Sequence, residues 1–127
     1  MIPSSILLVE DNSDDEYLAT RTLRKAGILA ISVARDGQEA LALLLAPDRP
    51  LPELLVLDLR LPKIDGIEVM TALRGNERTR FLPILALSSS EDPRDREVCQ
   101  QLGVCGFFSK PLDLMELQQA LESLPCT

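Results

Sequence analysis

The chain has 127 residues, which is the length of one domain, and 46% of them are hydrophobic although only 3% are aromatic, so we expect an aliphatic core. Its net charge of −7 disfavours direct binding to nucleic acid, which depends on a basic face. No apolar run approaches the roughly 20 residues that span a bilayer, and the N-terminal stretch lacks the basic start of a signal peptide, so we expect a cytoplasmic protein without membrane contact.

The N-terminal stretch predicts a strand followed by a helix. "SILLVE" (5–10) is a short apolar run typical of a strand that is buried on both faces. After Asp11, Ser13 and Glu16 have the spacing of a capping box at the start of a helix. Apolar residues at helical spacing continue as far as Gly27, which ends the helix.

The middle of the chain repeats this order. "LAISVA" (29–34) is a weaker strand candidate, and a helix is predicted over 38–45. Three prolines then exclude regular structure from 46–53, which resembles a surface insertion or a partner contact. "LLVLD" (54–58) is a second strand of the buried type.

Two further repeats complete the pattern. A helix follows Gly66, and the Asp65-Gly66 pair itself is typical of a turn. "PILALS" (83–88) predicts a buried strand, and a helix begins near Asp92 and Pro93. "GFFSK" (106–110) is a weaker strand, followed by a helix after Asp113.

Five strands alternating with five helices predict an α/β fold. Parallel neighbouring strands need crossover helices, so we expect a doubly wound, five-stranded parallel sheet with helices on both faces. No linker divides the sequence, and residues 1–127 are therefore predicted to form a single domain. The three cysteines, Cys99, Cys105 and Cys126, include no Cys-x-x-Cys pair, so free thiols are expected rather than disulfides or zinc ligands.

Polar residues stand where the predicted strands end. Ligands bind beyond the carboxyl ends of strands in an open parallel sheet, and that edge would collect Glu10, Asp11, Asp58, Ser88 and Lys110. Three clustered carboxylates repel one another unless a cation lies between them, and Mg²⁺ prefers such oxygen ligands. Asp58 could then attack a phosphoryl group to form an acyl phosphate, while Lys110 and Ser88 contact its other oxygens.

Each of these residues also has a simpler interpretation. Glu10 and Asp11 could cap a helix, Asp58 could cap a loop, and Lys110 could be a solvated lysine. Ser88 belongs to a serine run in which Ser89 or Ser90 could cap the next helix. The coincidence of all of them at one predicted edge favours a site.

Four stretches give the sequence a resemblance to a known family. "LLVEDN", "LLVLDLRLPKIDG", "LALSS" and "GFFSKP" resemble the response-regulator receiver domain of two-component signalling, over roughly Ser5–Leu124. The resemblance implies the flavodoxin-like (βα)5 fold. It also implies that Asp58 is the phosphoacceptor, Ser88 the switch hydroxyl, Phe107 the aromatic switch residue, and Lys110-Pro111 a cis peptide bond.

The family resemblance also implies a cofactor and partners. Asp11 and Asp58 would bind Mg²⁺ through their side chains, Arg60 through its carbonyl, and Glu10 through a water. A histidine kinase or phosphotransfer protein would donate the phosphoryl group, which fits a chain that has no histidine. Phosphorylation would change the face formed by the fourth helix, the last strand and the last helix. This face would bind a downstream protein target or a second copy of the chain.

Two features depart from the family pattern. Arg60 is a long cation that could reach the phosphoryl group or hinder attacking water, and Phe107 lacks the hydroxyl of the more usual tyrosine. The short sequence after the last predicted helix implies a stand-alone receiver without an output domain. Among such receivers, "VEDNSDDEYLA", "LPKIDG" and "ALSSSEDPRD" are similar to those paired with phytochrome-type kinases.

Two other functions compete with the phosphoacceptor. A nucleotide- or flavin-binding enzyme on the same fold would need glycines or hydroxyls after the first strand, whereas "EDNSDDE" is acidic and would repel phosphate. A degenerate receiver, acting as an interaction module without phosphorylation, is disfavoured by the complete acidic set with Ser88 and Lys110. The phosphoacceptor itself would not be an enzyme beyond catalysing its own phosphorylation and dephosphorylation.

Overall fold

A computed structural model describes residues 2–89 and 92–124. Strands and helices alternate strictly, as the sequence predicts. The strands are β1 (Ser5–Val9), β2 (Ala30–Ala34), β3 (Leu54–Asp58), β4 (Ile84–Ser88) and β5 (Gly106–Ser109). The helices are α1 (Ser13–Lys25), α2 (Gly37–Leu44), α3 (Gly66–Arg74), α4 (Pro93–Gln101) and α5 (Leu114–Glu122).

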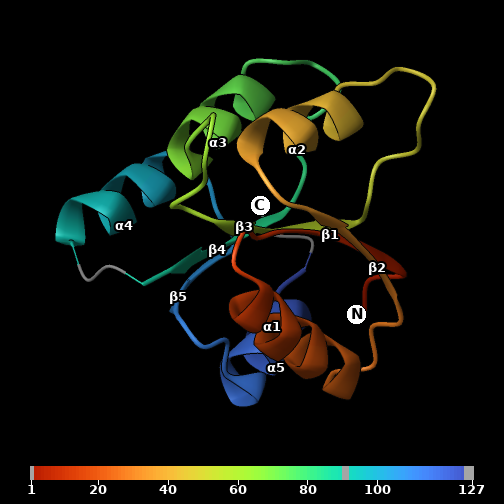
Figure 1. The fold of residues 1–127 in the computed structure, drawn as a ribbon, viewed down its shortest axis with the longest axis vertical. Coiled ribbons are helices and arrows are strands. Elements are labelled where there is room, and N and C mark those ends of the chain that lie inside the picture. The colour runs from red at the N-terminus through yellow and green to blue at the C-terminus, as the bar shows by residue number, and fades with distance from the viewer. Residues whose placement is uncertain (1, 90–91, 125–127) are drawn as a thin grey trace.

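The five strands form one parallel sheet in the order β2-β1-β3-β4-β5. The prediction of a doubly wound, five-stranded parallel sheet is therefore confirmed. After β1 the chain forms the edge strand β2, and it then returns to form β3 on the other side of β1. The helices that follow β1 and β3, α1 and α3, therefore lie on opposite faces of the sheet (Figure 1). This change of direction places the carboxyl ends of β1 and β3 side by side, where ligands of such sheets bind.

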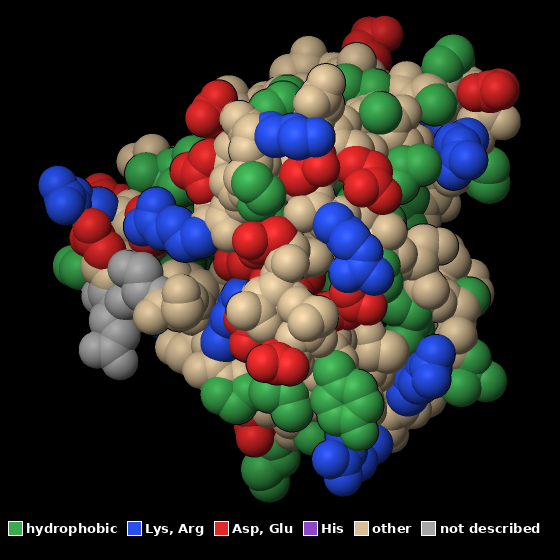
Figure 2. Space-filling model, in the orientation of Figure 1, with side chains coloured by type: hydrophobic (Ala, Val, Ile, Leu, Met, Phe, Trp, Pro, Cys, Tyr) green, Lys and Arg blue, Asp and Glu red, His purple; other side chains and the backbone are tan. Residues whose placement is uncertain are grey.

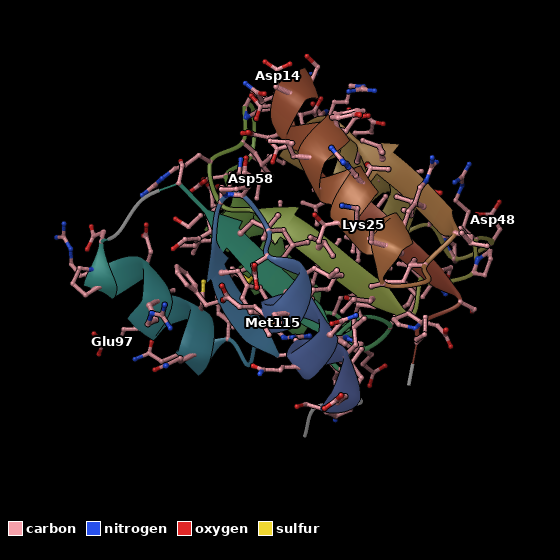
Figure 3. The ribbon with its side chains drawn as sticks, turned by 90° about the horizontal axis from the view of Figure 1, so that it is seen from below. Asp14, Lys25, Asp48, Asp58, Glu97 and Met115 are labelled. Carbon is pink, nitrogen blue, oxygen red and sulfur yellow. The ribbon has the colours of Figure 1, made fainter. Side chains whose placement is uncertain are left out.

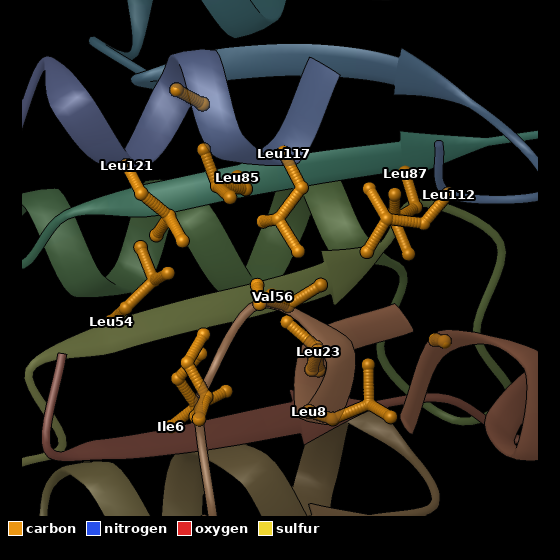
Figure 4. Packing of buried hydrophobic residues seen from close by; sticks show 14 of the residues in the cluster. Ile6, Leu8, Leu23, Leu54, Val56, Leu85, Leu87, Leu112, Leu117 and Leu121 are labelled. Atoms are coloured by element: carbon orange, nitrogen blue, oxygen red, sulfur yellow. The ribbon is translucent and has the colours of Figure 1, made fainter. Parts of the chain in front are cut away.

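Helices cover both faces of the sheet. Helices α1 and α5 lie on one face, and α2, α3 and α4 lie on the other (Figure 1). Side chains alternate along each strand, so that Ile6 and Leu8 pack toward α1 and α5 whereas Leu7 and Val9 pack toward α2 and α3. Figure 4 shows the first of these aliphatic cores, in which Leu23 of α1 meets the sheet.

A polar side chain caps each helix at its N-terminus. The capping residues are Asn12, Asp36, Asp65, Asp92 and Asp113. The capping box expected from Ser13 and Glu16 is wrong, because Asn12 accepts the hydrogen bond from the backbone of Asp15. Glu16 instead forms an ion pair with Arg35. The cap falls one residue earlier because Asn12 has the extended backbone that a cap requires.

Gly66 brings α3 against the backbone of β3. A Cβ atom at this position would lie 2.5 Å from the carbonyl oxygen of Asp58 and 2.6 Å from the Cα of Leu59. The Gly66 N–H donates to the Leu59 carbonyl at 3.0 Å. Asp65 and Gly66 are thus more than a turn, because together they begin α3 and fix the chain that follows Asp58.

Arg74 joins two loops at the opposite edge of the sheet. Its guanidinium donates to the carbonyl oxygens of Leu102 and Gly103, directly after α4, at 2.7 and 3.3 Å. It also donates to those of Arg80 and Leu82, before β4, at 3.1 and 2.8 Å. Because these bonds reach backbone atoms on both sides, the carboxyl end of α4 is fixed to the segment that leads into β4.

The cysteines differ from the expectation in one respect. Cys99 is a buried free thiol in α4, but Cys105 is disulfide-bonded, so the expectation of free thiols is wrong there. The sequence prediction failed because spacing along the chain does not report which thiols meet in space. Cys126 lies outside the described residues. Over those residues, every helix is too short or too polar to cross a membrane.

Candidate phosphoacceptor and metal site

The predicted polar residues meet at the carboxyl edge of the sheet. Glu10 directly follows β1, Asp58 is the last residue of β3, and Lys110 directly follows β5. Figure 3 shows Asp58 at the end of the sheet on the side where α1 begins near Asp14. Glu10 and Asp58 are almost fully buried, at 0% and 2% exposure, although both carry carboxyl groups. Buried carboxylates are costly without a cation, so this edge needs a positive partner.

Lys110 supplies that partner. Its Nζ lies 2.8 Å from Oε2 of Glu10 and donates a hydrogen bond to Oδ2 of Asp58 at 2.9 Å. A third carboxylate, Asp15 of α1, accepts from the same Nζ at 3.0 Å. A single ammonium group therefore faces three carboxylates and leaves excess negative charge at the site.

Three carboxylates are also placed to bind a cation. Ligand oxygens of Glu10, Asp11 and Asp58 all lie within 4.8 Å of one another. The buried Oε2 atom of Glu10 lies 2.8 Å from the Lys110 ammonium, which also faces Asp58 and Asp15. Two buried carboxylates and one exposed carboxylate offer the oxygen ligands that fit a hard divalent ion such as Mg²⁺.

The electrostatics of the buried groups reflect this crowding. Burial raises the pKa of Glu10 to about 7, the negative charge of Asp58 adds to the shift, and the hydrogen bond from Lys110 opposes it. Burial alone would lower the pKa of Lys110, but hydrogen bonds to Glu10, Asp58 and Asp15 outweigh it and raise the pKa instead. Lys110 is therefore held positive, while protons and cations compete for Glu10.

Ser88 and Phe107, the two residues expected to act as a switch, lie on the adjacent strands β4 and β5. Ser88 ends β4 and is buried at 1% exposure, and its carbonyl accepts from the N–H of Lys110 at 2.9 Å. The Lys110-Pro111 peptide bond is cis. Phe107 of β5 is partly buried beneath α4, and the guanidinium of Arg96 lies 4.7 Å from its ring centre. Ser88 therefore lies beside Lys110, and Phe107 lies against α4.

The side chain of Arg60 contacts α4. Its guanidinium forms an ion pair with Asp95 of α4 at 2.7 Å, while its backbone N–H donates to Oδ1 of Asp58 at 3.1 Å. The Arg60 side chain is half exposed, whereas the Asp95 side chain is largely buried. Arg60 therefore links the loop after Asp58 to the first turn of α4.

The sequence interpretation missed Asp15 and Asp95. Each is one acid among several near a helix start, where acids usually favour the helix dipole, so its residue type alone gives no signal. Asp11 and the extended cap residue Asn12 precede α1, so helical spacing does not relate Asp15 to the predicted acids, and its contact with Lys110 is seen only in the structure.

Comparison with known proteins agrees with this geometry. Residues 6–122 match the model of the response regulator receiver domain. The response regulator Rcp1 of Synechocystis is 33% identical over 129 residues, covering 95% of this chain and 88% of Rcp1. Its Mn²⁺-bound structure matches with a TM-score of 0.80 and 32% identity, over 96% of this chain and 94% of that one.

Two further solved structures are similar. The bacteriophytochrome response regulator AtBRR matches with a TM-score of 0.85 and 35% identity, over 98% of this chain and 94% of that one. The phosphorylated cyanobacterial phytochrome response regulator RcpA matches with a TM-score of 0.79 and 31% identity, over 95% and 90%. With a family match over almost the whole chain and the acidic cluster at the expected edge, this chain belongs to the response regulator receiver domain family.

Proposed function

We propose that this chain is a phosphoacceptor in two-component signalling and that Asp58 takes the phosphoryl group from a histidine kinase or phosphotransfer protein. The observation that carries the proposal is the contact of the buried Asp58 carboxylate with Lys110 at 2.9 Å, beside two further carboxylates within 4.8 Å. RcpA has been solved in a phosphorylated form and Rcp1 in a Mn²⁺-bound form, which supports the same chemistry here.

The residues have distinct roles in this proposal. A carboxylate oxygen of Asp58 attacks phosphorus, an O–P bond forms, and the P–N bond of the donor's phosphohistidine breaks with its electron pair left on the imidazole. Lys110 contacts a phosphoryl oxygen as a point charge, and the Ser88 hydroxyl donates to another. Mg²⁺, held by Glu10, Asp11, Asp58 and the Arg60 carbonyl, would supply positive charge that offsets the phosphoryl oxygens.

The output follows from the residues next to the site. A hydrogen bond from Ser88 to the phosphoryl group would draw β4 inward, and Phe107 would move into the space so released. The α4–β5–α5 face would then bind a downstream protein or a second copy of the chain. Figure 2 shows acidic and basic side chains interspersed over one face, without a continuous basic surface for nucleic acid. The single-domain organisation over 1–127 and the cytoplasmic location stay predictions.

A degenerate receiver is the second candidate. Such a module would bind partners without phosphorylation and would have no need for three carboxylates around one largely buried lysine side chain. Burying charged groups costs free energy unless they are paired, so we favour an active site. Regulation rather than turnover of an external substrate is typical of the family, and we propose no enzymatic activity beyond the chain's own phosphorylation and dephosphorylation.

Incubation with acetyl phosphate and Mg²⁺, followed by intact-mass measurement, tests the proposal. We expect the mass gain of one phosphoryl group. Hot acid should remove this gain, and omission of Mg²⁺ should prevent it. Asp58→Asn should show no gain. Asp48→Asn, which changes an exposed acid in the loop before β3, should behave like the wild type.

A folded wild-type protein that never gains mass would favour the interaction module. Equal labelling of Asp58→Asn and the wild type would show that another residue accepts the phosphoryl group.

A further inference from the structure

The three carboxylates around Lys110 are not equivalent. Its Nζ lies 2.8 Å from Glu10, 2.9 Å from Asp58 and 3.0 Å from Asp15. Glu10 and Asp58 also belong to the group of ligand oxygens that includes Asp11, whereas Asp15 does not. Two of the three anions that hold the ammonium are therefore the same anions that would hold a divalent ion.

This double use creates a conflict of charge. Oxygens of Glu10 and Asp58 that face a divalent ion attract the ammonium less, and the two cations repel each other at short range. Lys110 would then leave its position unless another anion held it. Asp15 is the carboxylate in contact with Lys110 that stays outside the cation group.

The placement of Asp15 suits this task. It lies in the first turn of α1, where its backbone N–H donates to the Asn12 side chain at 2.9 Å. Its own side chain is 37% exposed, whereas that of Lys110 is 13% exposed. The carboxylate of Asp15 thus lies at the rim of the site, in the first turn of α1, and the ammonium contacts both it and the buried pair.

We propose that Asp15 is a positioning residue that holds the Lys110 ammonium at the rim, so that Lys110 and Mg²⁺ can share Glu10 and Asp58. The inference rests on the proposed function, because it requires a divalent cation at the carboxylate group. Without Asp15, Lys110 depends on Glu10 and Asp58 alone and competes with the cation for their oxygens.

A simpler role for Asp15, stabilisation of α1 alone, predicts a different outcome. Acids in the first turn of a helix stabilise it through the helix dipole, and Asp14 lies in the same turn as Asp15. A dipole role would make Asp14 and Asp15 equivalent. Asp14 is exposed, and the ion pairs of the described residues include Asp15 with Lys110 but not Asp14.

Titration of the full chain with Mg²⁺ by calorimetry separates these roles. We expect the dissociation constant for Mg²⁺ to be about fivefold higher for Asp15→Asn than for Asp14→Asn. Asp15→Glu should recover most of the loss, because it keeps the charge. In a Lys110→Met background, Asp15→Asn and Asp14→Asn should have the same effect, because the group that Asp15 positions is gone. Thermal unfolding without Mg²⁺ checks that each variant is folded.

Three outcomes would overturn the inference. Equal effects of Asp15→Asn and Asp14→Asn in the wild-type background would leave only a dipole role. An Asp15→Asn effect of unchanged size in the Lys110→Met background would indicate that Asp15 acts through its charge alone. Lys110→Gln replaces Lys110→Met in this comparison if the methionine variant does not fold. A wild-type chain that binds no Mg²⁺ would overturn the proposed function together with the inference, whereas the first two outcomes would overturn the inference alone.

Discussion

The two sides of the carboxylate site are held in different ways. On the side of β1, α1 and β5, the Lys110 side chain is 13% exposed and lies among three carboxylates. On the side of α4, the Arg60 side chain of the Arg60–Asp95 ion pair is 53% exposed. Charges that are buried together cost much to separate, whereas exposed pairs contribute little. The first side therefore maintains the site, and the second side is the one that can rearrange at low cost.

Removing the Lys110 ammonium should have the largest effect on stability. Lys110→Met leaves Glu10 and Asp58 buried without a positive partner, and we expect the free energy of unfolding in Mg²⁺-free buffer at pH 8 to fall by about 3 kcal/mol. Urea unfolding measures this value, and added Mg²⁺ should restore part of it. Lys63→Met, which removes a mostly exposed lysine paired with Asp36, is the matched control and should change stability little.

The backbone after Asp58 is shared by both sides, and Gly66 tests how firmly it is fixed. Gly66→Ala puts a Cβ 2.5 Å from the Asp58 carbonyl oxygen and should lower the free energy of unfolding by about 2 kcal/mol. Gly75→Ala is the control, because its Cβ would lie no closer than 3.5 Å to a neighbour. Similar stability of the two variants would show that α3 can shift away from β3 without cost.

The raised pKa of Glu10 should make stability and Mg²⁺ affinity on the Lys110 side of the site depend on pH. Because this pKa is raised to about 7, the metal-free folded chain retains a proton that the unfolded chain has lost, and stability should fall as pH rises between 4.5 and about 7. Mg²⁺ must displace that proton, so its affinity should rise by up to about tenfold per pH unit below 7 and then level off. Calorimetry over pH 5.5–8 tests this prediction. A Glu10→Gln variant should lack the slope, and a wild-type chain without it would contradict the raised pKa.

The smallest effect is expected on the exposed side. A double-mutant cycle with Arg60→Met and Asp95→Asn should give a coupling of about 0.5 kcal/mol in the free energy of unfolding, as for a half-exposed ion pair. A coupling as large as the loss for Lys110→Met would show that both sides are equally firm and would remove the contrast.

Sequence reasoning predicted the sheet and the residues at its edge because both follow from chain order. Apolar runs alternate with helical patterns, and parallel strands must end at the same edge, which brings Glu10, Asp58 and Lys110 together. The contacts of Asp15 and Asp95 could not be predicted in this way. They depend on how α1 and α4 are rotated against the sheet, which is decided by packing rather than by residue type.

Local chemistry also left some choices open. Asn12 and Ser13 are both good capping residues, and only the backbone conformation selects Asn12. The Asp65-Gly66 pair predicts a turn equally well with or without a close approach to Asp58. The disulfide of Cys105 required a distance that no spacing along the chain provides.

Arg74 gives α4 one fixed end. Its guanidinium binds backbone oxygens directly after the helix, at Leu102 and Gly103, whereas Asp95 and Arg96 near the helix start make their contacts through side chains. Because these bonds hold the carboxyl end of α4, a rearrangement beside Asp58 would displace the first turn of the helix most. The last turn of α4 would stay in place.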